Sequence, residues 1–441
     1  MKSRLRMNLL GLSAVLPMLI ALIAILVVGS TFPSSTSAQG QKKLSVGVVV
    51  NTSDYKWISL LLKEYEKRTG IKIEESQFQT SDYVPKYTMA FEAKKPRYDV
   101  VMMWDVFLPQ MVAGNYLTPL DGSSNPKFRL SDEDRQDFFP QSLKGASMNG
   151  HLYAMPESLD TGLFYYRKDL YAQAGLTRPP RTWDELIAYS QKLTKGNQWG
   201  YAFIGAPSYT GAVTFFELLN QAGGTLLDDK GQPAFNSPAG AKALQFMVDL
   251  RNKYKVVPPG VNTYQNPQVH TGFLNGTFAQ VRHWPYLFGM AESPEKWGVA
   301  SAVKGQVGIA RLPYLEKNVS SFNNWTYAIP RTAENPEGGW ELIKFLTSRE
   351  SCLFEILYGL DLPARKSAYL NPEVAQKMPA YKEFFDLMYE VMQTAVPYTA
   401  PEAVDLFDTL GREMDRALVG SASAQEALNT AAGRVRGILK R

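Results

Sequence analysis

The sequence predicts an α/β fold of two lobes that several chain crossings connect, and three observations predict it. The chain has 441 residues, of which 45% are hydrophobic, and this length suits two domains with cores of their own. Short β-branched runs alternate with amphipathic helical stretches from Leu44 onward. No internal repeat, low-complexity tract or long linker divides the chain. We therefore expect lobes that share several connections.

The first elements follow a strand, helix, strand order. The run LSVGVVV (44–50) is predicted as a strand, and 56–70 as an amphipathic helix that stops at Gly70. Residues 71–78 alternate between apolar and polar, as in a half-buried strand. YDVVMMW (98–104) is a continuous apolar strand, typical of a strand covered on both faces by helices. These elements predict a largely parallel sheet.

Later helices are marked by capping residues at their starts. A side-chain oxygen at the N-cap accepts a hydrogen bond from a backbone N–H that has no partner within the helix, and proline fits the first helical position. Such starts are Thr182 with Glu185 as a capping box, Ser237 with Pro238, Asn335 with Pro336, and Ser423 with Glu426. Short apolar segments at 307–313 and 326–330 lie between these helices.

Residues 1–38 have the layout of an export signal. Lys2, Arg4 and Arg6 precede an apolar run over 9–28, and a small polar stretch leads to an expected cleavage after Ala38. The run is also long enough to span a bilayer, so an uncleaved N-terminal anchor is the alternative. A lipid anchor would need a cysteine after the run, and none is there. We expect a periplasmic protein.

The charge balance and the reactive residues exclude several functions. After cleavage the chain keeps 44 of its 47 basic residues and all 42 acidic ones, a formal charge of +2, which predicts no nucleic-acid partner. The only cysteine, Cys352, cannot form an internal disulfide. His151, His270 and His283 lack the spacing of metal ligands, so no metal site is expected. No cofactor and no catalytic residue is predicted.

Two stretches carry candidate binding residues. In VRHWPYLF (281–288), Trp284 and Tyr286 flank Pro285, which does not continue a central strand. The two rings either pack in the core or form the wall of a binding site. Asp160 precedes the strand-like TGLFYY, where a carboxylate can face a cleft or cap its own turn.

The segment 151–186, HLYAMPESLDTGLFYYRKDLYAQAGLTRPPRTWDEL, resembles the extracellular solute-binding proteins of carbohydrate ABC importers. This group includes the maltose and trehalose binders. Further motifs follow in the order that such proteins show: 215–247, FLNGTFAQVRHWPY (273–286), VGIARLPY (307–314), NPEGGWELIKFLTSRE (335–350) and LPARKSAYLNPEV (362–374). The resemblance extends from about residue 44 to the C-terminus.

This resemblance implies a type II periplasmic-binding-protein fold, whose two lobes close over a sugar and are joined by about three crossings. One lobe would hold 43–156 plus 312–358, and the other 157–311 plus 359–441. The implied partners are a pair of membrane permease subunits and a cytoplasmic ATPase. No GxxxxGK[ST] phosphate loop occurs in this chain, so the ATPase is a separate protein. A monomer is expected.

The resemblance also assigns binding roles by position. A pyranose has apolar C–H faces and an equator of hydroxyls, which suits an aromatic ring beneath it and polar groups around it. Trp284 occupies the place of a tryptophan that stacks on the sugar, and Trp325 that of a second one. Relatives carry two glycines before the latter, where this chain has Asn323 and Asn324. That departure puts a close backbone approach in doubt, and Asn324 is expected to offer its amide.

Charged and polar residues would surround the sugar. Asp160, Asp105 after Trp104, Asp54 and Arg365 match family positions, and strand ends in such sheets bind ligands. A surface salt bridge is the alternative for Arg365. Three further candidates are Glu217, for which an exposed helix or a lobe interface is the alternative, Gln79 and Tyr209.

Two other functions stay open at this point. Carboxylates and tryptophans beside a sugar also describe a glycoside hydrolase, which needs two carboxyl groups about 5 to 9 Å apart. The same fold could instead bind a polyamine, an anion or a compatible solute. Trp284, Asp160 and Arg365 together favour a neutral polyhydroxylated ligand, a disaccharide, an oligosaccharide or a glycoside, which the sequence does not rank.

Overall fold

The computed structural model describes residues 43–50, 56–79, 82–397 and 402–439. The expected export signal and Asp54 lie outside these ranges. Within them, no helix combines the length and the apolar character needed to cross a membrane.

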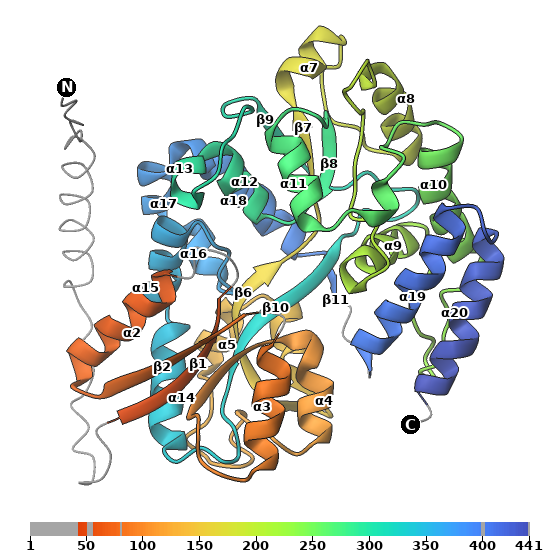
Figure 1. The fold of residues 1–441 in the computed structure, drawn as a ribbon. Coiled ribbons are helices and arrows are strands. Elements are labelled where there is room, and N and C mark those ends of the chain that lie inside the picture. Colours follow the sequence, from red (N-terminus) through yellow and green to blue (C-terminus); the bar gives the residue numbers. More distant parts are fainter. Residues whose placement is uncertain (1–42, 51–55, 80–81, 398–401, 440–441) are drawn as a thin grey trace, which may run out of the picture. The chain divides into compact units, whose positions relative to one another are not determined.

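The larger sheet has six strands (Figure 1). They are β1 (Lys43–Val49), β2 (Lys72–Phe78), β3 (Val100–Trp104), β6 (Ala154–Asp160), β10 (Ser321–Ala328) and β11 (Val396–Pro397). Their order is β11-β10-β3-β1-β2, and β6 pairs with β10. β1 is parallel to β2 and β3, whereas β10 is antiparallel to β3 and β6. Parallel pairing is found in β2-β1-β3 and in the short β10-β11 pair. The antiparallel pairs of β10 were not predicted, because an apolar pattern shows that a strand is buried but not in which direction it runs.

Helices pack on this sheet. They are α2 (Lys56–Thr69), α3 (Tyr83–Glu92), α4 (Leu108–Ala113), α6 (Pro140–Gly145) and α14 (Pro336–Leu346). The short helix α5 (Asp132–Asp137) buries none of its residues. α2 and α14 contact each other, and α14 contacts β3. On β1, Gly47 leaves room for the ring of Tyr87 from α3, because a Cβ there would lie 2.6 Å from the Tyr87 hydroxyl. A small hairpin of β4 (Ser147–Met148) and β5 (His151–Leu152) precedes β6.

A second sheet has three antiparallel strands in the order β8-β7-β9: β7 (Leu163–Arg167), β8 (Gln280–His283) and β9 (Val307–Ala310). The sequence analysis did not predict the direction of these strands. Only Thr161 and Gly162 separate β6 of the larger sheet from β7 of the smaller one. A second connection, residues 311–320, leads from β9 back to β10. The chain therefore passes between the sheets at two closely placed points.

Further helices surround the smaller sheet (Figure 1). They are α7 (Lys168–Gln173), α8 (Trp183–Leu193), α9 (Tyr209–Gln221), α10 (Pro238–Asn252), α11 (Asn266–Leu274), α12 (Tyr286–Glu292), α13 (Pro294–Trp297), α19 (Ala403–Leu418) and α20 (Ala424–Ile438). α9, α10, α19 and α20 pack against one another. α19 presents a strongly apolar face to this group, which includes Leu406, Leu410 and Met414.

The remaining segment contacts both regions. It contains α15 (Arg349–Phe354), a π-helical turn η4 (Glu355–Gly359), α16 (Lys366–Leu370), α17 (Pro372–Lys377) and α18 (Lys382–Met392). Pro363 bridges to Ser158 of β6, whereas Phe384 of α18 stacks on Phe288 of α12, with ring centroids 4.7 Å apart. The residue ranges predicted for the two lobes, and a third crossing near residue 358, remain predictions.

The predicted helix starts are confirmed. The side chains of Ser237 and Asn335 accept hydrogen bonds from the N–H groups of Gly240 and Gly338. Ser423 and Glu426 form a complete capping box. At the fourth start, Thr182 accepts from the N–H of Glu185. The Glu185 carboxylate accepts from the N–H of Arg181 instead of closing the predicted box, because it also binds Arg178.

Candidate functional site

Strand β10 brings several predicted site residues into one row. Trp325 of β10 lies opposite Trp104 at the end of β3, and Asn323 lies opposite Asp160 at the end of β6. The sequence analysis recognised the strand after Asp160 but not β6 before it, because Pro156 stands in the middle of β6. Asp160 thus lies between two strands, at the point where the chain leaves the larger sheet.

Trp104, Trp325, Tyr209 and Phe407 form one aromatic group. The Trp104 and Trp325 rings are nearly parallel, at 17° with centroids 6.0 Å apart. Tyr209 at the start of α9 meets Trp104 edge-on at 5.2 Å and contacts Phe407 of α19 at 5.0 Å. The aromatic group therefore links β3 and β10 of the larger sheet to helices beside the smaller one. The buried Trp104 Nε1 has no hydrogen-bond partner among the described residues.

Asp105 and Asn324 are bonded to each other beside the aromatic group. The Asp105 Oδ2 accepts from the backbone N–H of Asn324 at 3.0 Å and from its Nδ2 at 2.9 Å. Nδ2 also donates to the carbonyl of Ser142. Burial raises the pKa of Asp105 well above its ordinary value. The Asn324 Nδ2 therefore donates its hydrogen bonds within the protein, to Asp105 and Ser142. A contact between this amide and a ligand stays a prediction.

Glu217 of α9 and Arg282 of β8 form a buried ion pair. Nε and Nη2 of Arg282 donate to the two carboxylate oxygens at 2.7 and 2.6 Å, and the side chains are 1% and 2% exposed. The Oγ of Ser321 donates to Oε1 at 2.5 Å. A Cβ on Gly162 would lie 2.0 Å from Glu217 Oε1, so glycine is required there. Burial of Glu217 contradicts the exposed helix considered as its alternative. The lobe interface stays open as the other alternative, because Ser321 of β10 also donates to Glu217.

Trp284 is held from several sides. The Arg282 guanidinium lies over its ring at 3.9 Å from the centroid, a geometry that favours cation–π attraction. Its Nε1 donates to Asn266 Oδ1 at 3.1 Å, and the residue is 3% exposed. One ring face is therefore covered by the protein. Tyr286, at the start of α12, packs on Trp297 with centroids 6.0 Å apart.

Asp160 has an unusual electrostatic setting. It is only partly buried as a residue, and its Oδ1 accepts from the N–H of Thr161 at 3.1 Å. Burial of the carboxyl, above all, raises the pKa of Asp160 to about 8; the charge of Arg282 opposes this rise, and that of Asp361 adds to it. Near neutral pH the carboxyl is therefore largely protonated, so it can donate as well as accept a hydrogen bond.

Two predicted residues lie apart from these groups. The Arg365 Nη1 binds Asp134 and Asp137 at 2.8 and 3.2 Å, and its Nε donates to the carbonyl of Thr347. The Arg365 side chain is buried, whereas Asp134 is 42% exposed, so the salt bridge considered as its alternative is present and reaches the surface at Asp134. Gln79 is exposed just after β2. Asp54 lies outside the described residues.

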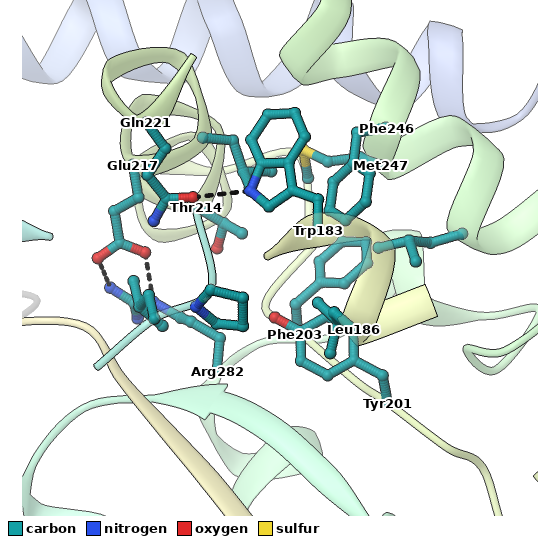
Figure 2. A pocket seen from close by; sticks show the side chains of 14 residues that line it. Trp183, Leu186, Tyr201, Phe203, Thr214, Glu217, Gln221, Phe246, Met247 and Arg282 are labelled. Atoms are coloured by element: carbon teal, nitrogen blue, oxygen red, sulfur yellow. Dashed lines mark hydrogen bonds and ion pairs between the residues drawn. The ribbon is translucent and has the colours of Figure 1, made fainter. Parts of the chain in front are cut away.

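A small cavity lies behind the ion pair (Figure 2). Its walls include Trp183, Phe203, Phe246 and Met247, with Glu217 and Arg282 on one side. Figure 2 shows the Trp183 indole donating to Gln221, a bond of 3.0 Å. The volume of about 20 Å³ suits one water molecule rather than a sugar.

An open hollow of about 450 Å³ lies between β9 and α18. It is lined by Ile309, Pro379, Lys382, Glu383, Asp386, Leu387 and Glu390. The volume would admit a monosaccharide, but the lining has no aromatic ring on which a sugar could stack. The aromatic group and Asp160 remain the better candidate site.

Sequence reasoning missed three residues in this region: Arg282, Phe407 and Asp361. Arg282 stands two positions before Trp284 in VRHWPYLF, so the alternation of a strand could have placed both on one face. No pattern in the neighbouring sequence identifies Phe407 or Asp361 as a site residue, because both reach the site from distant segments of the chain.

The chain matches known proteins over most of its length. A curated relative from Deinococcus radiodurans, named a probable ABC transporter-binding protein, is 25% identical over 383 residues, 84% of this chain and 87% of the relative. A mannitol-binding protein of Pseudomonas aeruginosa is 24% identical over 423 residues, 89% of this chain and 92% of the relative.

Solved structures show the same fold. The maltose-bound MalE3 of T. maritima has a TM-score of 0.78 at 27% identity and covers 90% of this chain and 99% of its own. A solute-binding protein from Agrobacterium radiobacter in complex with ribitol has a TM-score of 0.76 at 26% identity, with coverage of 90% and 98%. These likenesses confirm the two-lobed α/β fold. The family model for bacterial extracellular solute-binding proteins matches residues 50–351, and the chain belongs to this family.

Proposed function

We propose that this protein is the substrate-binding component of an ABC importer and that its ligand is a sugar or a sugar alcohol. It binds the ligand without cleaving it and delivers it to membrane permease subunits. A relative bound to maltose, a mannitol-binding relative and a relative in complex with ribitol support this ligand class.

The aromatic group carries the proposal. Trp104 and Tyr209 contact each other although they come from β3 and α9, on the two sides of the β6–β7 connection. A ligand beside them would touch both regions at once, which is how a ligand stabilises a closed state. The flat rings suit the C–H face of a sugar or the carbon chain of a polyol.

Polar groups beside these rings suit hydroxyls. The unpartnered Trp104 Nε1 offers a donor. The free Oδ1 of Asp105 offers an acceptor when the carboxyl is ionised and can donate when it is protonated. The raised pKa of Asp160 allows it both roles. A hydroxyl is itself a donor and an acceptor, so it can satisfy each of these groups. A polyamine offers only donors once it is charged, and an anion only acceptors.

The first experiment is a thermal-shift screen of the purified chain, with calorimetry on every hit. The panel holds maltose, ribitol, mannitol and tagatose, along with spermidine and sulfate as the alternative classes. A ligand that binds only the folded state raises the melting temperature by mass action. We expect a shift with a member of the first set. A shift with spermidine or sulfate alone would contradict the ligand class, and release of reducing sugar at enzymatic turnover would contradict binding without cleavage.

Two variants then locate the site. Trp104→Ala is expected to weaken the affinity for the identified ligand at least tenfold, about 1.4 kcal/mol, because it removes a stacking ring. Trp284→Ala tests the position assigned by resemblance and is expected to act in the same direction. Trp199→Phe, which changes a tryptophan beside Phe278 and away from these groups, is the matched control. Unchanged affinity in both alanine variants would contradict this location.

A further inference from the structure

Three carboxylates converge close to Asp160. Glu157 lies in β6, Glu355 begins the π-helical turn η4, and Asp361 follows that turn. One carboxylate oxygen of each lies within 4.8 Å of an oxygen of each of the others. We call these residues the acidic cluster. Its members come from separate segments, so the fold rather than the local sequence brings them together.

Two oxygens of the acidic cluster have no partner. Glu157 and Glu355 are 2% and 1% exposed, and the Oε1 atom of each makes no hydrogen bond within the described part of the chain. Buried polar atoms are almost always satisfied in native proteins, and an exception indicates a water or an ion. These orphan oxygens are a second observation, independent of the proximity of the three side chains.

Within the described part of the chain, no basic side chain forms an ion pair with the acidic cluster. Among the ion pairs of the described residues, none includes Glu157, Glu355 or Asp361. The nearby Arg365 directs its guanidinium to Asp134 and Asp137. Two buried like charges beside the partly buried Asp361 require either protons or a cation, since each would be both desolvated and repelled by the others. Burial raises the pKa of Glu157 and of Glu355 for this reason.

The backbone around the acidic cluster is held in place. Leu360 adopts a left-handed conformation with φ of 57° and ends the π-helical turn, which directs Asp361 back toward β6. The N–H of Ala364 donates to the carbonyl of Glu157, and that of Leu159 donates to the carbonyl of Leu362. Trp57 of α2 packs on Gly359 and donates a hydrogen bond to the Asp361 carboxylate. The carboxylates therefore sit on a preformed frame.

We propose that Glu157, Glu355 and Asp361 bind one Ca²⁺ ion. Carboxylates are the ligands of hard cations, and three of them can supply most of the six to eight oxygens that Ca²⁺ takes. Mg²⁺ keeps several waters and demands octahedral geometry, so a buried cage of carboxylates suits it less well. This site lies close to Asp160, whose pKa the charge of Asp361 helps to raise, but the metal proposal does not rest on the proposed ligand and is tested by other measurements.

Terbium luminescence tests the site directly, because Tb³⁺ replaces Ca²⁺ at oxygen sites and is excited by energy transfer from a nearby indole. We expect saturable Tb³⁺ emission that excess Ca²⁺ abolishes. Trp57→Phe should remove most of the emission, because it replaces the indole beside Asp361; since it also removes a hydrogen-bond donor to that carboxylate, the emission is compared at saturating Tb³⁺. Trp57 thus identifies this site among eight tryptophans.

A second measurement does not rely on fluorescence. Millimolar CaCl₂ should raise the melting temperature above that in EDTA, and Glu355→Gln should weaken the apparent Ca²⁺ affinity at least tenfold. Glu373→Gln, which changes a glutamate paired with Lys377 on α17, is the control. Melting of each variant in EDTA verifies that it folds. Absence of both the emission and the Ca²⁺-dependent shift, or an affinity that Glu355→Gln leaves unchanged, would overturn the proposal in favour of shared protons.

Discussion

Buried carboxylates occur in two settings in this protein: Glu217 is paired with Arg282, whereas those of the acidic cluster have no basic partner among the described residues. Glu217, Glu157 and Glu355 are buried to the same degree, at 2%, 2% and 1% exposure. Glu217 receives a guanidinium on both oxygens, and Ser321 as a further donor. Glu157 receives only Ser158, at 2.7 Å, from a described residue, and both glutamates of the acidic cluster keep an orphan oxygen.

This difference separates two uses of a buried carboxylate. A charge matched inside the chain ties elements together, here α9, β8 and β10, at any pH where both groups stay ionised. A group of carboxylates without a matching cation depends on what the solvent supplies, whether protons or metal ions. The two arrangements lie on the two sides of the β6–β7 connection, and their responses to mutation, pH and cations should differ.

The largest expected effect is that of Arg282→Met. It leaves the Glu217 carboxylate buried without its counterion and uncovers the ring of Trp284, which should reduce the free energy of unfolding by about 3 to 5 kcal/mol. Urea denaturation measures it. The double variant Arg282→Met, Glu217→Gln removes both charges and should recover part of the loss. A double variant as unstable as the single one would show that lost packing, rather than unpaired charge, dominates.

The second-largest effect is expected for Asp160→Asn, which should change how the free energy of unfolding depends on pH. The pKa of Asp160 is raised to about 8 in the folded protein, against about 3.9 in an unfolded chain. Between these values the folded state holds a proton that the unfolded state has released, so stability falls as the pH rises, by up to about 1.4 kcal/mol per pH unit. Asparagine keeps an acceptor for the Thr161 N–H and cannot ionise.

The stability of Asp160→Asn should therefore change less between pH 5 and pH 8 than that of the unmodified chain. Urea denaturation at both pH values, in EDTA, isolates this group from any cation at the acidic cluster. Parallel pH profiles for the two proteins would contradict the raised pKa of Asp160.

The smallest expected effect comes from removing one serine hydroxyl that donates to a buried glutamate, either at the acidic cluster or at the Glu217–Arg282 pair. Ser158→Ala removes the donor to Glu157 Oε2 and should cost about 1 kcal/mol, because no basic residue replaces it. Ser321→Ala is the matched variant on the other side, and should cost less, because Arg282 retains both oxygens of Glu217. Urea denaturation ranks the two, and the reverse ranking would contradict the account of their partners.

Local patterns in the sequence predicted a large part of the fold. The capping residues Ser237, Asn335 and Ser423 and the early strands depend on neighbours in the chain, so periodicity and side-chain chemistry reveal them. The direction of β10 and the antiparallel smaller sheet were missed, because strand direction depends on the route of the chain between distant segments. Pro156 concealed β6 for a different reason: proline argues against a strand, and it is tolerated here because, among the described strands, β6 pairs with β10 alone.

For the candidate site, the sequence by itself determined the residue types: the tryptophans in HWPY and NNW, and the carboxylates at strand ends. Only the tertiary structure decided which of them meet. It placed Tyr209 and Phe407 on Trp104, gave Arg282 to Glu217 and Trp284, directed Arg365 to Asp137, and assembled the acidic cluster. Stacking, ion pairing and ligation act over a few ångströms between residues far apart in the chain, and no local pattern records such distances.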